Sequence, residues 1–273
     1  MSNPTPPAAA RRLPASAFIG ATASVVLLLL VPIQPAAAII GGTADGTRHP
    51  YVGTLDASYF GRPDGPTGVL ISPTVLLTVG HVTTNWEHAG LRARVTFDPA
   101  RSSATVWHTG TAYTSPAYDP QRADASNDLG VVVFDSPVTD RAPAALPAAN
   151  LLETLGVRNL RDASFELVGY GTSLVVGGPN GGGQPHPDRS TGGTRKVAIQ
   201  TFMSMTSSWL RLQQHEDGSA CVGDSGSPSL FAGTNLIAAI HVGGVGQCRN
   251  TAWEQRIDTP SARAFLSRFV QLP

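Results

Sequence analysis

The chain has 273 residues, of which 41% are hydrophobic and 14% are charged. This balance fits a globular protein and is too apolar for a disordered one. It carries 19 basic and 19 acidic residues, and residues 1–38 contribute only Arg11 and Arg12, so the remainder has a net charge of −2. Because no basic stripe is present, nucleic acid is not an expected partner.

The N-terminal segment has the three parts of a secretory signal. Arg11 and Arg12 supply the charged region, an apolar run is densest from Val25 to Val31, and Ala36–Ala38 offers small residues for cleavage. The alternative is a membrane anchor, but the run is shorter than the roughly 20 residues that span a bilayer and is followed by two prolines. We therefore expect a signal peptide over residues 1–38, removed by signal peptidase, and a secreted product with no stable membrane association.

The residues after the leader form short apolar runs rich in β-branched and aromatic residues, separated by Gly, Pro, Asn and Asp. This spacing is typical of an all-β sandwich or a pair of β-barrels. The runs are Gly68–Leu77, Leu91–Phe97, Leu129–Phe134, Phe165–Val168, Lys196–Phe202, Trp209–Leu212 and Leu236–Val242.

A helix is predicted only at the end of the chain. Segment Ser261–Val270 places apolar residues at helical intervals after Pro260, and no long amphipathic helix is expected before it. About 235 residues follow the leader, a length that suits two small barrels. Because the alanine- and proline-rich segment Ala142–Asn150 reads as their connection, we predict domains over residues 39–150 and 151–273.

The run Gly223-Asp224-Ser225-Gly226 is the first candidate for chemistry. A polar turn would use the same residue types. A nucleophilic serine needs a neighbouring base, an acid that orients the base, and donors for an oxyanion. His81 follows an apolar run and a small residue, and Asp128 directly precedes the apolar run Leu129–Phe134. Taken alone, His81 would more often be a structural histidine and Asp128 a loop-end acid.

The order His81, Asp128, Ser225 is that of the chymotrypsin-type triad. Thr78-Val79-Gly80-His81 resembles the Thr-Ala-Ala-His motif of the trypsin/chymotrypsin-type serine proteases, and Asp128–Val132 resembles their Asp-Ile-Ala-Leu segment. Gly223–Pro228 resembles Gly-Asp-Ser-Gly-Gly-Pro with one serine in place of a glycine, and Ile39–Gly42 resembles the mature Ile-Val-Gly-Gly terminus. The resemblance covers roughly residues 39–270. It implies two antiparallel six-stranded β-barrels with the active site between them and a C-terminal helix.

The resemblance also implies residue roles in the hydrolysis of peptide bonds. Ser225 would attack, His81 would act as base, and Asp128 would orient His81. Backbone N–H groups of Gly223 and Ser225 would form the oxyanion hole. The freed ammonium of Ile39 would form an ion pair with Asp224, here created by signal peptidase itself because no basic residue lies near the junction.

Other implied positions concern the specificity pocket. Cys221 and Cys248 match the disulfide that flanks it, and two cysteines fit an exported protein with one bridge. Neutral Ser219 at its base and Gly243 in its wall favour an apolar or aromatic side chain before the scissile bond rather than Arg or Lys. His241 replaces the serine expected beside Asp128, where it would compete for that acid, support it or point away from it.

Alternatives from other classes remain at this point. A catalytically weak or inactive homologue would act as a binding protein, and an exported esterase would use the same serine chemistry. No Cys-x-x-Cys or His-Glu-x-x-His spacing occurs, so we expect no metal and no cofactor. The expected partner is a protein or peptide substrate, and the expected state is a monomer. The single lysine, Lys196, among 19 basic residues favours a GC-rich bacterial source.

Overall fold

The computed structural model describes residues 1–3, 39–62, 64–122, 126–176, 185–215, 218–244, 248 and 251–273. The chain divides into two compact units, Met1–Gln34 and Pro35–Pro273, and every helix and strand described lies in the second. Beyond its first three residues, the expected signal peptide lies outside the described part of the chain. None of the helices found in the described ranges is long and apolar enough to cross a membrane.

Six antiparallel strands close the first barrel. In spatial order they are β2 (Val52–Leu55), β3 (Thr67–Ser72), β4 (Val75–Thr78), β7 (Gly130–Phe134), β6 (His108–Thr114) and β5 (Ala93–Thr96). Their short lengths and high content of Val, Leu and Thr suit strands that are largely buried. The first barrel therefore comes from one continuous half of the chain.

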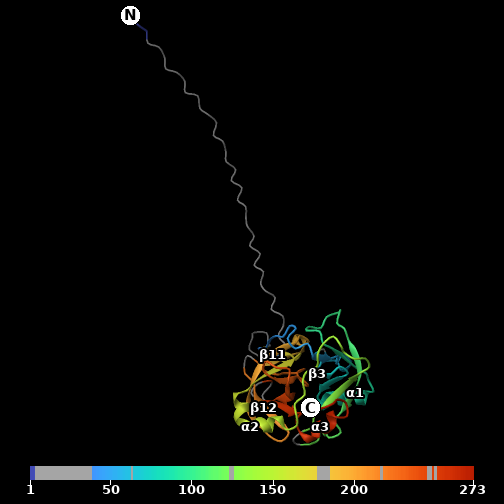
Figure 1. Cartoon of the computed structure of the whole chain (residues 1–273). Coiled ribbons are helices and arrows are strands. Elements are labelled where there is room, and N and C mark those ends of the chain that lie inside the picture. Colours follow the sequence, from blue (N-terminus) through green and yellow to red (C-terminus); the bar gives the residue numbers. More distant parts are fainter. Residues whose placement is uncertain are drawn as a thin grey trace. The chain divides into compact units, whose positions relative to one another are not determined.

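Six further strands form the second barrel. In order they are β8 (Ser164–Gly169), β11 (Lys196–Met205), β12 (Trp209–Gln213), β15 (Thr251–Arg256), β14 (Ile237–Gly244) and β13 (Pro228–Phe231). Pairing of β8 with both β13 and β11 closes the ring, and β1 (Thr43–Ala44) adds to β11. β9 (Ser173–Val176) and β10 (Pro185–Asp188) form a separate hairpin. The prediction of two six-stranded antiparallel barrels is confirmed, and Figure 1 shows β3 and β11 in different parts of the same compact body.

Helices are more numerous than the sequence predicted. α1 (Gly80–Ala89) and α2 (Leu151–Asp162) precede the C-terminal α3 (Pro260–Leu266). The C-terminal helix was predicted, whereas α1 and α2 were not. α1 is rich in β-branched residues, which have low helix propensity. α2 is interrupted at Gly156, which has a non-helical φ of 72°. The sequences of α1 and α2 therefore do not show the regular pattern of a stable helix. Packing against the rest of the protein stabilises these helices more than their helix propensity does.

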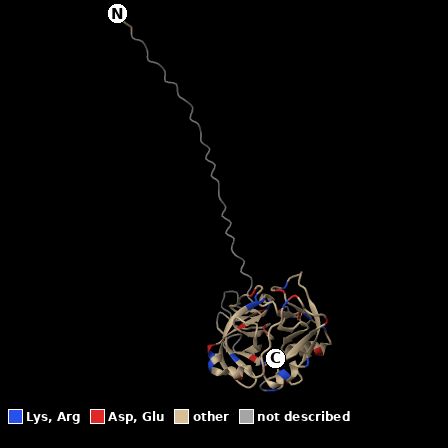
Figure 2. Ribbon diagram, viewed as in Figure 1, with Lys and Arg blue, Asp and Glu red and all other residues tan. Residues whose placement is uncertain are grey.

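The two barrels share one hydrophobic core. A single cluster of buried residues includes Val69 and Leu76 of the first barrel and Val168 and Ile240 of the second. In the view of Figure 2, acidic and basic residues are interspersed along the ribbon. Burial of apolar side chains therefore joins the two barrels.

A buried arginine adds polar contacts to this junction. Arg195 is 2% exposed, and its Nε donates to Asp45 Oδ2 at 2.7 Å. Its Nη1 donates to the carbonyl oxygens of Val52 and Phe97 and to the hydroxyl of Tyr170, each at 3.0 Å. Because these partners come from both halves of the chain, one guanidinium links the first barrel to the second.

The carboxylate of Asp45 depends on this cation. Burial opposes its ionised form, but hydrogen bonds from His49 and Arg195 outweigh burial and hold the pKa of Asp45 below its usual value. The carboxylate is therefore charged at neutral pH, and removing Arg195 would leave it in the interior with His49 and the more distant Arg48, whose Nε lies 3.6 Å from Asp45 Oδ1, as its side-chain partners.

We predict that Arg195→Met lowers the free energy of unfolding by about 3–5 kcal/mol, the usual effect of removing one partner of a buried ion pair. Urea unfolding at pH 7 measures the change. Arg158→Met on the exposed face of α2 is the matched control and should change stability by less than about 0.5 kcal/mol. Equal stability of the two variants would show that Arg195 does not hold the barrels together.

Candidate active site

His81 and Asp128 meet at one end of the first barrel. His81 lies in the first turn of α1, and Asp128 stands two residues before β7. Asp128 Oδ2 is 2.7 Å from His81 Nδ1, and Asp128 Oδ1 accepts the backbone N–H of His81 at 2.7 Å. Asp128 is buried, whereas the His81 side chain is 34% exposed. The carboxylate thus favours a proton on Nδ1 and leaves Nε2 free to accept another.

The residue before His81 has to be small. A Cβ atom on Gly80 would lie 3.0 Å from Asp128 Oδ1 and 3.1 Å from the carbonyl oxygen of Leu129. Glycine therefore lets the carboxylate approach the backbone of His81 closely.

The loop that carries Ser225 is fastened to the first barrel. Thr67 N donates to the carbonyl oxygen of Ser225 at 2.9 Å, and Thr67 Oγ1 donates to that of Gly223 at 3.0 Å. A Cβ atom on Gly226, whose φ is +90°, would lie 2.2 Å from Thr78 Oγ1. Thr78 is three residues before His81, so the loop packs against the strand end that leads to the imidazole.

Ser225 itself is partly exposed. Among the described residues its Oγ has no hydrogen bond, and its contact with His81 stays a prediction. Such catalytic hydrogen bonds often tighten only when substrate is bound.

The backbone around Ser225 presents free donors. Asp224, Gly226 and Ser227 donate their N–H groups to carbonyl oxygens. In the described part of the chain, the N–H groups of Gly223 and Ser225 have no acceptor. Gly223 has a φ of +96°, a conformation that side chains rarely adopt. Two unpaired N–H groups that are separated by one residue can bind an oxygen that develops negative charge.

Asp224 is buried beneath the same loop. Its carboxylate accepts the N–H groups of Gly171 at 2.8 Å and Cys221 at 2.9 Å. Burial raises its pKa to about 6, against the effect of these hydrogen bonds. In the uncut chain Ile39 is an internal residue and has no ammonium group. The ion pair between Ile39 and Asp224 therefore stays a prediction, and it concerns the processed protein only.

Ile39 already lies inside the second barrel. It is fully buried, in a small cluster with Leu167, Ala198 and Ala220. The next residue, Ile40, exchanges two backbone hydrogen bonds of 3.0 Å with Ser219. The start of the domain is thereby attached to the segment that leads to Ser225.

The expected pocket residues lie in this region. Ser219 is buried and its Oγ donates to the carbonyl oxygen of His215 at 2.8 Å. A Cβ atom on Gly243 would meet no atom of the described residues within 4 Å. The disulfide between Cys221 and Cys248 is formed, as predicted.

His241 pairs with a buried carboxylate other than Asp128. Its Nδ1 lies 2.9 Å from Glu254 Oε1, and both side chains are buried. Among the described residues no hydrogen bond or ion pair joins His241 to Asp128, which agrees with the last of the three possibilities raised by the sequence. Sequence reasoning missed Glu254 because its position opposite His241 follows from the register of β14 and β15.

This buried pair adjoins the nucleophile loop. The N–H of Gly226 donates to the carbonyl oxygen of His241, and the N–H of His241 donates to that of Ser227, both at 2.8 Å. Burial opposes the imidazolium form, but the negative charge of Glu254, the hydrogen bond that Glu254 accepts from the imidazole, and the charge of Asp224 together raise the pKa of His241.

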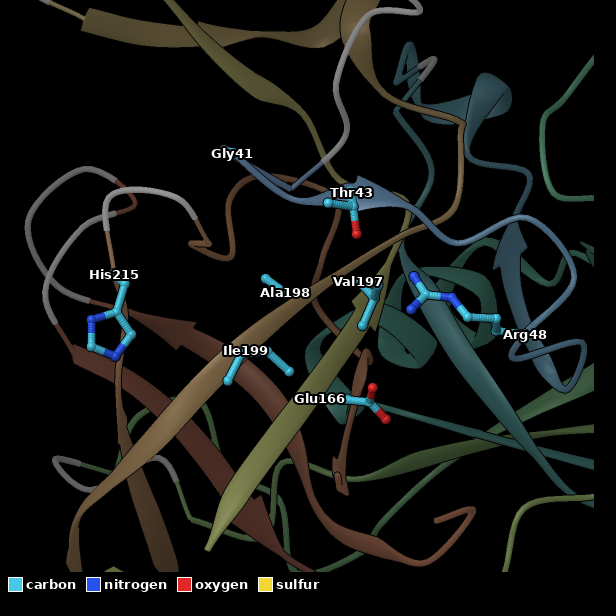
Figure 3. Close-up of a pocket in the computed structure, with 8 residues that line it drawn as sticks. All are labelled: Gly41, Thr43, Arg48, Glu166, Val197, Ala198, Ile199 and His215. Atoms are coloured by element: carbon cyan, nitrogen blue, oxygen red, sulfur yellow. The ribbon is translucent and has the colours of Figure 1, made fainter. Parts of the chain in front are cut away.

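A separate cavity lies away from this site. It has a volume of about 450 Å³, and neither His81, Asp128 nor Ser225 lines it. Figure 3 shows the side chains of Arg48 and Glu166 near the same space. No cluster of three or more His, Cys, Asp or Glu side chains suited to a metal is present in the described ranges.

We predict that Glu254→Gln lowers the pKa of His241, because the favourable charge is lost while burial remains. A raised histidine pKa stabilises the fold below the unfolded value near 6.5 and that gain disappears as pH rises through the folded value. The variant should therefore lose more stability at pH 5 than at pH 9. NMR titration of His241 and thermal unfolding across this range measure both effects. His108 is the internal control, and an unchanged His241 titration would contradict the prediction.

The comparisons with known proteins agree with this geometry. The family model described as Trypsin matches residues 39–263. A solved structure titled human heparin binding protein has a TM-score of 0.61 and 16% identity, and the match covers 85% of this chain and 96% of that one. Another, titled atomic resolution structure of HBP, has a TM-score of 0.63 and 16% identity, with 86% and 98% covered.

At this identity the solved structures show the fold alone. No curated protein matches the chain. The family model spans most of the sequence and contains all three triad positions. The chain therefore belongs to the trypsin family.

Proposed function

We propose that the protein is a secreted serine endopeptidase. The observation that carries this proposal is the pair of 2.7 Å contacts between Asp128 and His81 beside a serine loop with two unpaired N–H groups. Base, acid and oxyanion donors are the parts that serine hydrolysis requires. The substrate is a protein or peptide, and the enzyme works as a monomer.

The reaction runs through an acyl-enzyme. Ser225 Oγ attacks the scissile carbonyl carbon while His81 Nε2 takes its proton. The N–H groups of Gly223 and Ser225 stabilise the oxyanion. His81 then donates the proton to the leaving nitrogen, the C–N bond breaks, and a water molecule activated by His81 releases the acyl group. Asp128 keeps the imidazole oriented and stabilises its cation.

The proposed preference before the scissile bond is an apolar or aromatic side chain. Ser219 carries no charge, and its hydroxyl is already bonded to the chain. Ser219 therefore offers no charge to Arg or Lys, and among the described residues nothing fills the space beside Gly243, which suits a bulky uncharged group.

A catalytically weak homologue that binds another protein is the alternative. Both solved structures with similar folds carry titles that refer to HBP or heparin binding. This chain has one lysine and, after the leader, a net charge of −2, which is a poor match for a polyanion. The presence of all three triad residues favours catalysis.

Maturation would complete the site. Removal of the leader after Ala38 by signal peptidase would give Ile39 an ammonium group, and an ion pair with buried Asp224 would order the oxyanion loop. A positive charge at that place offsets the desolvation of the carboxylate.

We predict that a fluorophosphonate probe labels the secreted protein and that Ser225→Ala abolishes the labelling. Asp128→Asn should lower kcat by about 10⁴-fold, the effect known for a triad acid made neutral, because an amide favours the His81 tautomer that cannot accept the serine proton. Gel fluorescence measures the labelling of the Ser225→Ala variant, and peptide hydrolysis measures kcat of the Asp128→Asn variant. Labelling that survives Ser225→Ala would place the nucleophile elsewhere, and a folded protein that takes no probe would favour the binding homologue.

We predict that the secreted protein begins at Ile39 and that processing changes its pH response. In the uncut chain Asp224 has a folded pKa of about 6 against an unfolded value near 3.8, so it destabilises the fold by about 3 kcal/mol as pH rises between these values. Thermal unfolding of the uncut and mature forms, both as Ser225→Ala, measures this. The loss should shrink in the mature form. A first residue other than Ile39 would refute the proposed maturation.

A further inference from the structure

An open polar cavity of about 400 Å³ lies where the two halves of the chain meet. Arg101 and Ser102 line it from the first half, and Arg189, Gly193 and Thr194 line it from the second. The two walls are joined by a hydrogen bond of 3.0 Å from Arg101 N to the carbonyl oxygen of Gly193. Among the described residues that line it none is a carboxylate, and the Asp64 carboxylate next to it is bonded to Arg189. The charged side chains of its described lining are therefore both cations.

Arg101 is an unpaired cation in this cavity. It is half-buried, and among the described residues its guanidinium has no hydrogen-bond acceptor and no ion-pair partner. The two fully buried arginines differ, because Arg195 is bonded to Asp45 and Arg256 to Asp258. Burial lowers the pKa of Arg101 despite the attraction of Asp56 and Asp64.

The guanidinium of Arg101 is held close to the backbone of Gly193. A Cβ atom at that position would lie 2.9 Å from both Nε and Nη2 of Arg101. A partly desolvated cation without a partner is unfavourable unless something supplies the opposite charge. An anion bound beside Arg101 would supply this opposite charge.

A second guanidinium is fixed beside the first. Arg189 Nη1 donates to both carboxylate oxygens of Asp64, at 2.8 and 2.9 Å, while the side chain is 47% exposed. This contact uses one of its three nitrogens. In the described part of the chain, Thr194 Oγ1 has no hydrogen bond, and Ser102 Oγ only accepts one, from Ala104 N. Two cations and two hydroxyl groups suit a carboxylate.

The cavity adjoins the nucleophile loop through Asp64. A Cβ atom on Gly192 would lie 3.2 Å from Asp64 Cβ, and one on Gly223 would lie 2.8 Å from the Asp64 carbonyl oxygen. Asp64 therefore stands between the cavity and one expected oxyanion donor. An anion bound in the cavity would therefore lie on the Asp64 side of the loop that carries Ser225.

The arrangement of the loop decides which part of the substrate this is. On one flank, Gly226 is hydrogen-bonded to β14, the strand that carries Gly243 and the expected pocket for the residue before the scissile bond. On the other flank, Gly223 and Ser225 contact Thr67 and Asp64 of the first barrel. A peptide that enters from β14 leaves over Asp64.

We propose that Arg101 and Arg189 bind the carboxylate of an acidic residue on the leaving-group side of the scissile bond. This inference rests on the proposed peptidase function, because it names a second recognition element of the same substrate. It adds a preference for Asp or Glu after the cleaved bond to the apolar preference before it.

Fluorogenic peptides that differ only in Glu or Gln at each of the first four positions after the scissile bond test the proposal. For the mature enzyme, kcat/KM should be about tenfold higher with Glu at one of these positions. The ratio should fall to near one in Arg101→Gln, be partly kept in Arg101→Lys, and shrink as salt rises from 0.05 to 0.5 M. Arg158→Gln, exposed on α2, is the control and should keep the wild-type ratio.

Binding without cleavage separates this inference from the proposed function. Calorimetry with Ser225→Ala should show tighter binding of the best Glu peptide than of its Gln partner, and Arg101→Gln in the same background should remove the difference. This result would support the site even if the wild-type protein cleaved nothing. Equal ratios for Glu and Gln at all four positions, or a preference that survives Arg101→Gln, would overturn the proposal. Inorganic phosphate that binds through Arg101 without any preference among peptides would identify a site for a free anion and refute the substrate role.

Discussion

The relation between the two barrels depends on one buried cation. Arg195 donates hydrogen bonds to the carboxylate of Asp45, to backbone carbonyl oxygens of β2 and of the segment after β5, and to the hydroxyl of Tyr170. Tyr170 in turn donates to the carbonyl oxygen of Asp98 at 2.7 Å. Hydrophobic contact is non-directional and would let the barrels slide. Directed bonds from one guanidinium fix their rotation as well as their separation.

That rotation matters because the candidate site is divided between the barrels. His81 and Asp128 belong to the first and Ser225 to the second, and two bonds from Thr67 to the serine loop are the direct link. The glycine at 226 allows contact with Thr78 that no side chain would permit. A small displacement of one barrel would therefore change the geometry between Ser225 and His81 before it disturbed the packing of the core.

Much of this could be predicted from the sequence, because four short motifs each have one place in a known fold. The four motifs in the order His81, Asp128 and Ser225, together with the short apolar runs, predict two barrels with a site between them. The disulfide between Cys221 and Cys248 followed from the same resemblance and is formed. Such motifs are local, and the fold that they imply brings distant segments together.

The parts that could not be predicted depend on register and packing. The register of the antiparallel pair β14 and β15 places Glu254 opposite His241. The sequence of either strand alone does not reveal this pairing. The unpaired state of Arg101 likewise appears only when residues 192–194 are brought against it. α1 and α2 escaped notice because neither has the regular composition of a stable isolated helix, and each relies on the barrel that it covers.

The burial of Ile39 has a consequence for the order of events during biogenesis. A peptidase needs the bond that it cuts, and the residues on both sides, to be extended and accessible. In the folded chain Ile39 is fully enclosed and Ile40 is hydrogen-bonded to Ser219. If the leader is cut before Ile39, that cut has to come before the second barrel closes over it. Cleavage of the leader then competes with folding of the second barrel, and chains that fold before cleavage would stay unprocessed.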